Sequence, residues 1–136
     1  MVGLKRSLEN GCPLRGTVDR LGDRWSVMVV VELEKAPARF NELRRRVTLH
    51  CAASSISARM LTVTLRALER DGLITRTIRS RRGIQVEYEL TALGWSFLEL
   101  ARAAMAWTDR SQASIAAARE RFDGDEREWA GMRLTG

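Results

Sequence analysis

The sequence predicts a mainly α fold with a small β component, in which five helices accompany a single β-hairpin. Three observations support this class. Apolar residues recur at intervals of three and four over most of the chain, alternate between Leu73 and Leu90, and return to a 4-3 spacing from Leu93. With 136 residues, 45% of them apolar, the chain is long enough for one compact domain and a modest appendage.

The first helix is expected to begin at Cys12-Pro13, because proline tolerates the first helical position, and to end at Gly22. Asp23 can cap a second helix from Arg24 to about Lys35. The β-branched run Val27 to Val31 is also compatible with a strand, but its flanks favour a buried central helix.

A third, short helix is predicted from Arg39 to Val47, after the Ala36-Pro37 break. It places Phe40, Leu43 and Val47 on one side. The polar stretch from Thr48 to Ser55 has no periodicity and is predicted to be a loop.

The fourth helix is predicted over Ser57 to Asp71, with Ser57 as its cap and Gly72 as its stop. Its apolar seam consists of Met60, Leu61, Leu65 and Leu68. The opposite face carries Arg59, Thr62, Val63, Arg66 and Arg70.

Two strands follow, alternating at Ile74, Arg76 and Ile78 and again at Val86, Tyr88 and Leu90. The intervening residues 79–83 form a basic turn in which Gly83 can adopt a positive φ.

Thr91 is predicted to cap a last, long helix. Its apolar residues recur with the spacing of a coiled-coil seam and comprise Leu93, Phe97, Leu100, Ala104 and Trp107. Residues 111–136 are expected to be helical to about Phe122 and then to fray. The predicted organisation is an N-terminal arm (1–11), a main domain (12–108) and a helical extension or tail (109–136).

Positive charge is concentrated in the middle of the chain. Eleven arginines lie between Arg39 and Arg82 against Glu42, Glu69 and Asp71, a net charge of +8, whereas the remaining residues sum to −2. A basic block confined to one region indicates an anionic partner, with nucleic acid as the default candidate.

Several classes of protein are excluded by what the sequence lacks. Two cysteines, Cys12 and Cys51, do not form a disulfide framework, and one histidine without a Cys-x-x-Cys pair argues against a metal site. The longest apolar run is too short to cross a bilayer, and no motif for nucleotide binding or hydrolysis is present. We therefore expect a cytoplasmic protein that is not an enzyme and has no cofactor.

A short helix, an amphipathic helix and a basic-tipped hairpin, in that order, form the layout of a winged helix-turn-helix. In that layout the face of the fourth helix opposite its seam enters the major groove of DNA. The hairpin, or wing, contacts phosphates or the minor groove. The candidate DNA-binding residues are Arg44, Arg45, Arg46, Ser57, Ala58, Arg59, Thr62, Val63, Arg66, Arg79, Arg81 and Arg82.

The chain resembles the HxlR-type family of bacterial transcriptional regulators, a winged-helix group related to the MarR regulators. The matching segments are 12-CP, 20-RLGDRWSVMVV, 39-RFNELRRRV, 56-ISARMLTVTLRALERDGLITRT, 86-VEYELTALG and Trp107. The resemblance implies a homodimer paired through terminal helices, acting on pseudo-palindromic double-stranded DNA in the bacterial nucleoid.

Two segments depart from the family pattern. The segment 48-TLHCAASS-55 is several residues longer than the family's turn, and Gly83-Ile84 replaces the Pro-Pro pair usual in the wing. The sequence therefore does not predict that this chain shares the operator preferences of the family.

The predicted dimer surface is the seam of Leu93, Phe97, Leu100, Ala104 and Trp107; packing of these residues on their own domain is the alternative. Cys12 is a candidate redox sensor, since it lies at a helix start near basic residues, and some relatives are thought to use a cysteine there. A structural cysteine and a small-molecule effector in place of an oxidant both remain open.

An alternative function is a nucleic-acid or RNA-binding winged helix without sequence specificity. Readers of single strands usually offer aromatic stacking platforms, whereas the basic region has only Phe40, on an apolar face.

Overall fold

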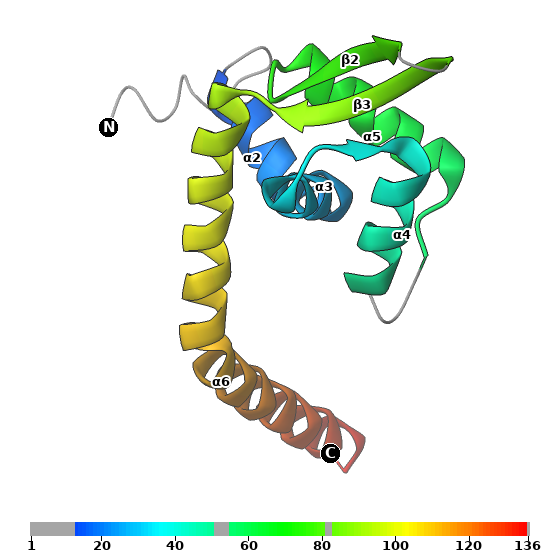
Figure 1. Ribbon diagram of the computed structural model, residues 1–136. Helices are drawn as coiled ribbons and strands as arrows, with labels where there is room; N and C mark the ends of the chain where they lie inside the picture. Colours follow the sequence, from blue (N-terminus) through cyan, green and yellow to red (C-terminus); the bar gives the residue numbers. More distant parts are fainter. Residues whose placement is uncertain (1–12, 51–54, 81–82, 136) are drawn as a thin grey trace. The chain divides into compact units, whose positions relative to one another are not determined.

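The computed structural model describes residues 13–50, 55–80 and 83–135 of the chain. It contains five helices and three strands in these ranges (Figure 1). In chain order they are α2 (Pro13–Gly22), α3 (Arg24–Lys35), β1 (Ala38–Arg39), α4 (Phe40–His50), α5 (Ala58–Arg70), β2 (Ile74–Ser80), β3 (Ile84–Leu90) and α6 (Ala92–Leu134). The chain forms two compact units, one ending at Ala101 and the other beginning at Arg102.

Helix α3 is the central helix of the first unit and contacts α2, α4, α5 and β3. The Asp23 carboxylate caps it, accepting from the Trp25 N–H at 3.2 Å and from the Ser26 hydroxyl at 2.5 Å. Val29 and Val30 are fully buried. The predicted bounds of this helix are confirmed, because burial outweighs the strand propensity of its valines.

A short strand, β1, was not predicted. Ala38 pairs with Tyr88 of β3 and Arg39 pairs with Glu87, which gives an antiparallel sheet in the order β1-β3-β2. As a result α4 begins at Phe40 rather than Arg39, and it continues to His50 rather than ending at Val47. A strand of two residues is too short to show an alternating pattern, so the sequence carries no signal for it.

The hairpin and the junction that follows it agree with the prediction, except that the turn is shorter than the predicted residues 79–83. Arg79 and Ser80 belong to β2, because they pair with residues of β3. Ile74 pairs with Leu90 and Ser80 with Ile84, and Gly83 has a φ of 106°. Thr91 caps α6, because its hydroxyl oxygen accepts from the Gly94 N–H at 3.0 Å. The same hydroxyl donates to the Gly72 carbonyl at 2.6 Å and so ties α6 to the end of α5.

The core gathers buried side chains from α3, α4, α5, the hairpin and the start of α6. Met60, which we predicted in the α5 seam, is instead 45% exposed, and Thr64 is buried in the seam with Leu61, Leu65 and Leu68. Position 60 lies a full 100° around the helix from Leu61, on the side away from the core.

One charged group is buried in the core region. The Glu32 carboxylate is 1% exposed and lies 3.0 Å from Lys35 Nζ and 2.8 Å from His50 Nδ1. These contacts satisfy the buried carboxylate. They also attach the last residue of α4 to α3, directly before the segment that leads to α5.

Helix α6 is longer than predicted: it continues past Phe122 to Leu134. The final residues are mostly good helix formers, and Gly124 and Gly131 cost about 1 kcal/mol each relative to alanine without ending the helix. Among the described residues, none of the helices has an apolar stretch long enough to cross a membrane.

The close approach of α6 to the end of α5 yields the first prediction. A Cβ placed on Gly94 would lie 2.0 Å from the Leu73 carbonyl oxygen, a backbone atom that cannot move aside easily. We expect Gly94→Ala to lower the free energy of unfolding by about 3 kcal/mol, measured by urea denaturation. Gly16→Ala is the matched control, since a Cβ there meets nothing within 4 Å and should stabilise α2 by up to about 1 kcal/mol. Equal effects of the two changes would show that the close approach is absent.

Candidate nucleic-acid interface

The interface is built on α5, whose orientation is fixed by a cap and a buried seam. The Ser57 hydroxyl accepts from the Met60 N–H at 3.1 Å, which sets the first turn as predicted. The seam is buried: at most 1% of the surface of Leu61, Leu65 or Leu68 is exposed. Because three leucines hold one side of α5 inside, the opposite side is held in solvent.

The exposed face of α5 carries the residues singled out in the sequence: Arg59, Thr62, Val63, Arg66 and Arg70 are all exposed. Val63, the apolar member of this face, is 57% exposed. Within the residues that the structure describes, Arg59 and Arg66 make no ion pair or hydrogen bond. Their guanidinium groups are therefore available to an external anion or acceptor.

Thr62 is more restricted than its exposure suggests. Its hydroxyl donates to the Ala58 carbonyl at 2.8 Å, one turn back along α5. The proton is thus engaged within the helix, and the oxygen retains its lone pairs. In contact with a base edge Thr62 would act as an acceptor.

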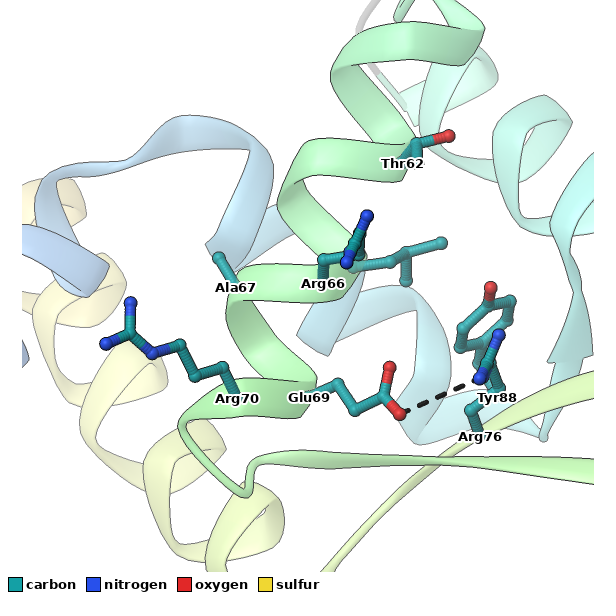
Figure 2. A pocket seen from close by; sticks show the side chains of 8 residues that line it. Thr62, Arg66, Ala67, Glu69, Arg70, Arg76 and Tyr88 are labelled. Atoms are coloured by element: carbon teal, nitrogen blue, oxygen red, sulfur yellow. Dashed lines mark ion pairs between the residues drawn. The ribbon is translucent and has the colours of Figure 1, made fainter.

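A groove of about 930 Å³ lies between α5 and the hairpin. Thr62, Arg66 and Arg70 of α5 line it together with Arg76 and Tyr88 of the sheet. Figure 2 shows Arg76 and Tyr88 on one side of α5, whereas the guanidinium group of Arg70 extends from the other side. Arg76 Nε lies 3.8 Å from Glu69 Oε1 across the groove, which joins strand and helix. The groove is therefore lined by three arginines, a hydroxyl and a phenol against a single carboxylate.

Arg76 and Tyr88 were not among the predicted site residues. They face each other as a cross-strand pair, on the same side of the hairpin as the buried pair Ile74 and Leu90. The alternation that placed them on that side was visible in the sequence. What the sequence did not reveal is that the sheet extends beyond the core at this point, so that its inner face meets the edge of α5.

The three consecutive arginines of α4 do not behave alike. Arg44 Nε donates to the Ile56 carbonyl at 3.0 Å, and Arg46 contacts Glu42 at 2.5 Å and the Ala36 carbonyl at 3.4 Å. Arg45 is exposed and has no polar partner among the described residues. Arg44 thus holds the segment before α5, and Arg45 is the member whose charge faces solvent.

At the wing, Arg79 Nε lies 3.4 Å from Glu87 Oε1 on the paired strand. Arg81 and Arg82, which we predicted at the tip, lie outside the described residues, as does the candidate sensor Cys12. At the other end of the interface, Ser57 and Ala58 are exposed at the start of α5.

The predicted dimer seam is divided by the fold. Phe97 is 8% exposed and belongs to the core of its own unit, whereas Leu93 is 55% and Leu100 44% exposed. Ala104 and Trp107 lie in the second unit, and Trp107 is 55% exposed. In the single chain, Phe97 therefore follows the alternative interpretation of packing on its own domain, and the other four remain open to a partner.

The described elements are those of a winged helix-turn-helix: α4 and α5 joined by a connecting segment, followed by a β-hairpin whose base is fixed to α6. The chain belongs to the HxlR-like helix-turn-helix family, whose family model matches residues 20–115. It is a transcriptional regulator of the helix-turn-helix type and not an enzyme.

Several relatives support this assignment. The HTH-type transcriptional regulator YtfH of Escherichia coli is 31% identical over 125 residues, covering 88% of this chain and 94% of YtfH. The HTH-type regulator YdeP of Bacillus subtilis is 39% identical over 84 residues, covering 62% of this chain and 61% of YdeP.

Two solved structures share both fold and sequence. The YtfH regulator of Salmonella typhimurium has a TM-score of 0.65 and 31% identity, over 82% of this chain and 95% of that one. The redox regulator HypR in its reduced form has a TM-score of 0.64 and 30% identity, over 77% of this chain and 98% of that one.

The phenol in the groove provides the second prediction. Burial raises the pKa of Tyr88 above 10.0; Arg76 lowers this pKa and Glu69 raises it, both to a smaller extent. Since Tyr88 is the one tyrosine in the sequence, the ultraviolet absorbance of phenolate reports on it alone.

In a pH titration of the folded chain, we expect the midpoint of the phenolate signal to lie above the midpoint of the denatured chain, which is about pH 10. The neutral phenol is favoured in the fold, so its contribution to stability is complete below about pH 10 and is lost as the pH rises through the raised pKa. Tyr88→Phe should abolish the signal. A midpoint at or below that of the denatured chain would contradict the burial of the phenol in the groove.

Proposed function

We propose that this chain acts as a homodimer that binds specific sequences in double-stranded DNA, with α5 in the major groove. The observation that carries the proposal is the exposed face of α5, where Arg59 and Arg66 stand without a partner among the described residues beside a groove lined by further arginines. An arginine can donate two hydrogen bonds to guanine O6 and N7, and a valine can contact the thymine methyl.

Each part of the interface has a distinct role in this proposal. Arg59, Thr62, Val63 and Arg66 contact base edges, while the start of α5 at Ser57 and Ala58 leaves room for close approach to the backbone. Arg45 contacts phosphate, with a smaller contribution from Arg44 and Arg46 because they have partners inside the domain. The wing residues Arg79, Arg81 and Arg82 contact phosphates or the minor groove.

One such domain contacts only a few base pairs, so specificity requires a second copy. Two domains related by a two-fold axis would bind half-sites about 34 Å apart in a pseudo-palindrome. Leu93, Leu100, Ala104 and Trp107 supply the exposed apolar surface for this dimer. A protein with this function acts on chromosomal DNA, so we propose that it is located in the bacterial cytoplasm, in association with the nucleoid.

The proposal is tested by separating base recognition from phosphate attraction. We expect Arg66→Ala to reduce discrimination at one base pair by about 1–3 kcal/mol, because a paired guanine contact is lost. Arg45→Ala is the matched control: it should weaken all duplexes alike and reduce the salt dependence by about one phosphate contact. The measurement is binding to duplexes selected from a random pool, at several salt concentrations.

Two outcomes of that experiment would refute the assignment. If Arg66→Ala and Arg45→Ala had the same effect on every duplex, α5 would not contact base edges. If RNA hairpins competed as well as duplex DNA, the alternative of a non-specific nucleic-acid binder would hold instead.

A redox response of the regulator is proposed on a separate observation. The solved structures with similar fold include the redox regulator HypR, in reduced and oxidised forms, and diamide-treated YodB of Bacillus subtilis, which has a TM-score of 0.62 and 26% identity over 75% of this chain and 96% of that one. In the sequence Cys12 directly precedes Pro13, at which α2 begins. The dipole of a helix stabilises a thiolate at such a position, so we propose Cys12 as the sensor.

We expect a thiol oxidant to weaken DNA binding by the native chain and to leave a Cys12→Ser variant unaffected, as measured by the affinity for a selected duplex. Cys51→Ser serves as the control and should retain the response. If the native chain binds equally well before and after oxidation, the sensor role of Cys12 is wrong, while the proposed DNA binding is unaffected.

A further inference from the structure

The second unit of the chain consists of the tail helix, which we define as residues 102–134 of α6. It extends well past residue 115, where the match to the family ends. Large apolar side chains occupy it: Phe122 is 65%, Trp129 64% and Met132 60% exposed. This amount of exposed apolar surface on one helix indicates an interaction surface.

These side chains recur with the spacing of a coiled coil. Intervals of three and four residues connect a single stripe, which comprises Ile115, Ala118, Phe122, Asp125, Trp129 and Met132. A repeat that averages 3.5 residues keeps one stripe facing a partner helix along its whole length. The partner is thus expected to be another helix.

We infer that the tail helix pairs antiparallel with the tail helix of a second copy of this chain. In the pairing that best fits the stripe, Trp129 lies opposite Ala118 of the second copy, Met132 opposite Ile115, and Phe122 opposite Asp125. Each pair occurs twice by symmetry, with the two-fold axis between Phe122 and Asp125. A large side chain then meets a small one at the tryptophan, which suits close packing of the helices.

Charges beside the stripe support this alignment. Arg119 and Arg121 flank the stripe in one heptad, and Glu126 and Glu128 flank it in the next. In the antiparallel pairing Arg119 lies near Glu126 of the second copy, and Arg121 near Glu128. Within the described ranges none of these four residues forms an ion pair in the single chain, so all four are available to a partner.

Other alignments match less well. Sliding the antiparallel pair by one heptad either way brings Arg119 and Arg121 against their own copies, or Glu126 and Glu128 against theirs. Like charges facing each other across a coiled coil disfavour the pairing. A parallel pair would still match Arg121 with Glu126, but it would place Asp125 directly against its own copy inside the stripe. Of these four alignments, only the first antiparallel one avoids both conflicts.

The experiment uses the full chain and reverses the flanking charges. Arg119→Glu/Arg121→Glu makes all four flanking residues acidic, and Glu126→Arg/Glu128→Arg makes all four basic. The mass of each chain is measured by sedimentation equilibrium over a range of concentrations. As the concentration rises, we expect the native chain to reach twice the mass that either double variant reaches. An equimolar mixture of the two double variants should recover the native mass, as should the chain that carries all four changes.

Controls separate pairing from folding and net charge. Arg110→Glu/Arg127→Glu changes the net charge by the same amount as the first double variant, but at positions away from the stripe, and should keep the native mass. Circular dichroism checks that each variant remains helical. A native chain whose mass equals that of the double variants at every concentration would overturn the inference.

The direction of pairing is tested by cross-linking in chains whose two cysteines are replaced by serine. Chains with Ile115→Cys and chains with Met132→Cys should form a disulfide when mixed, and neither should do so alone. Cross-linking of the Met132→Cys chain with itself would show parallel pairing and overturn the alignment.

This pairing goes beyond the proposed DNA-binding function and can fail independently of it. Mass and cross-linking are measured without DNA, so they do not depend on the proposed function. If the chain binds no specific duplex but charge reversal halves its mass, the tail pairing is supported and the proposed function is refuted. The reverse result supports DNA binding and refutes the pairing.

Discussion

The burial of one side of α5 is the constraint on which the rest of the interface depends. Leu61, Leu65 and Leu68 pack into the core, and burying each leucine contributes about 1.5–3 kcal/mol relative to leaving it exposed. Rotating α5 to hide its arginines would expose these leucines and bury guanidinium groups, and both changes are unfavourable. The same contacts that stabilise the fold therefore determine which residues face outward.

The arginines of this chain divide into those that hold the fold and those that remain available. Arg20 contacts Asp71 at 2.5 Å, joining α2 to the end of α5, and Arg39 contacts Gln85 at 2.5 Å, joining β1 to β3. Arg44 joins α4 to the segment before α5. The helix and sheet around the groove are thus positioned partly by basic residues, while other basic residues beside them keep their charge in solvent.

Much of this architecture could be predicted from the sequence, because periodicity and capping residues act over short distances. The bounds of α3, the caps Ser57 and Thr91, and the hairpin all follow from such local patterns. The failures concern contacts that depend on the whole fold. Two residues cannot show that they form β1, and three adjacent arginines on α4 cannot show which of them will meet a carbonyl. Tyr88 and Arg76 line the groove because the sheet extends beyond the core to the edge of α5, which no local pattern indicates.

The junction between α5, β2 and α6 also has a mechanical consequence. Thr91 N–H donates to the Leu73 carbonyl at 3.1 Å, its hydroxyl donates to Gly72, and Gly94 packs against Leu73. These contacts join the first turn of α6 directly to the segment that ends α5. A displacement of the first turn of α6 would therefore also displace the end of α5, which carries Arg70 of the exposed face.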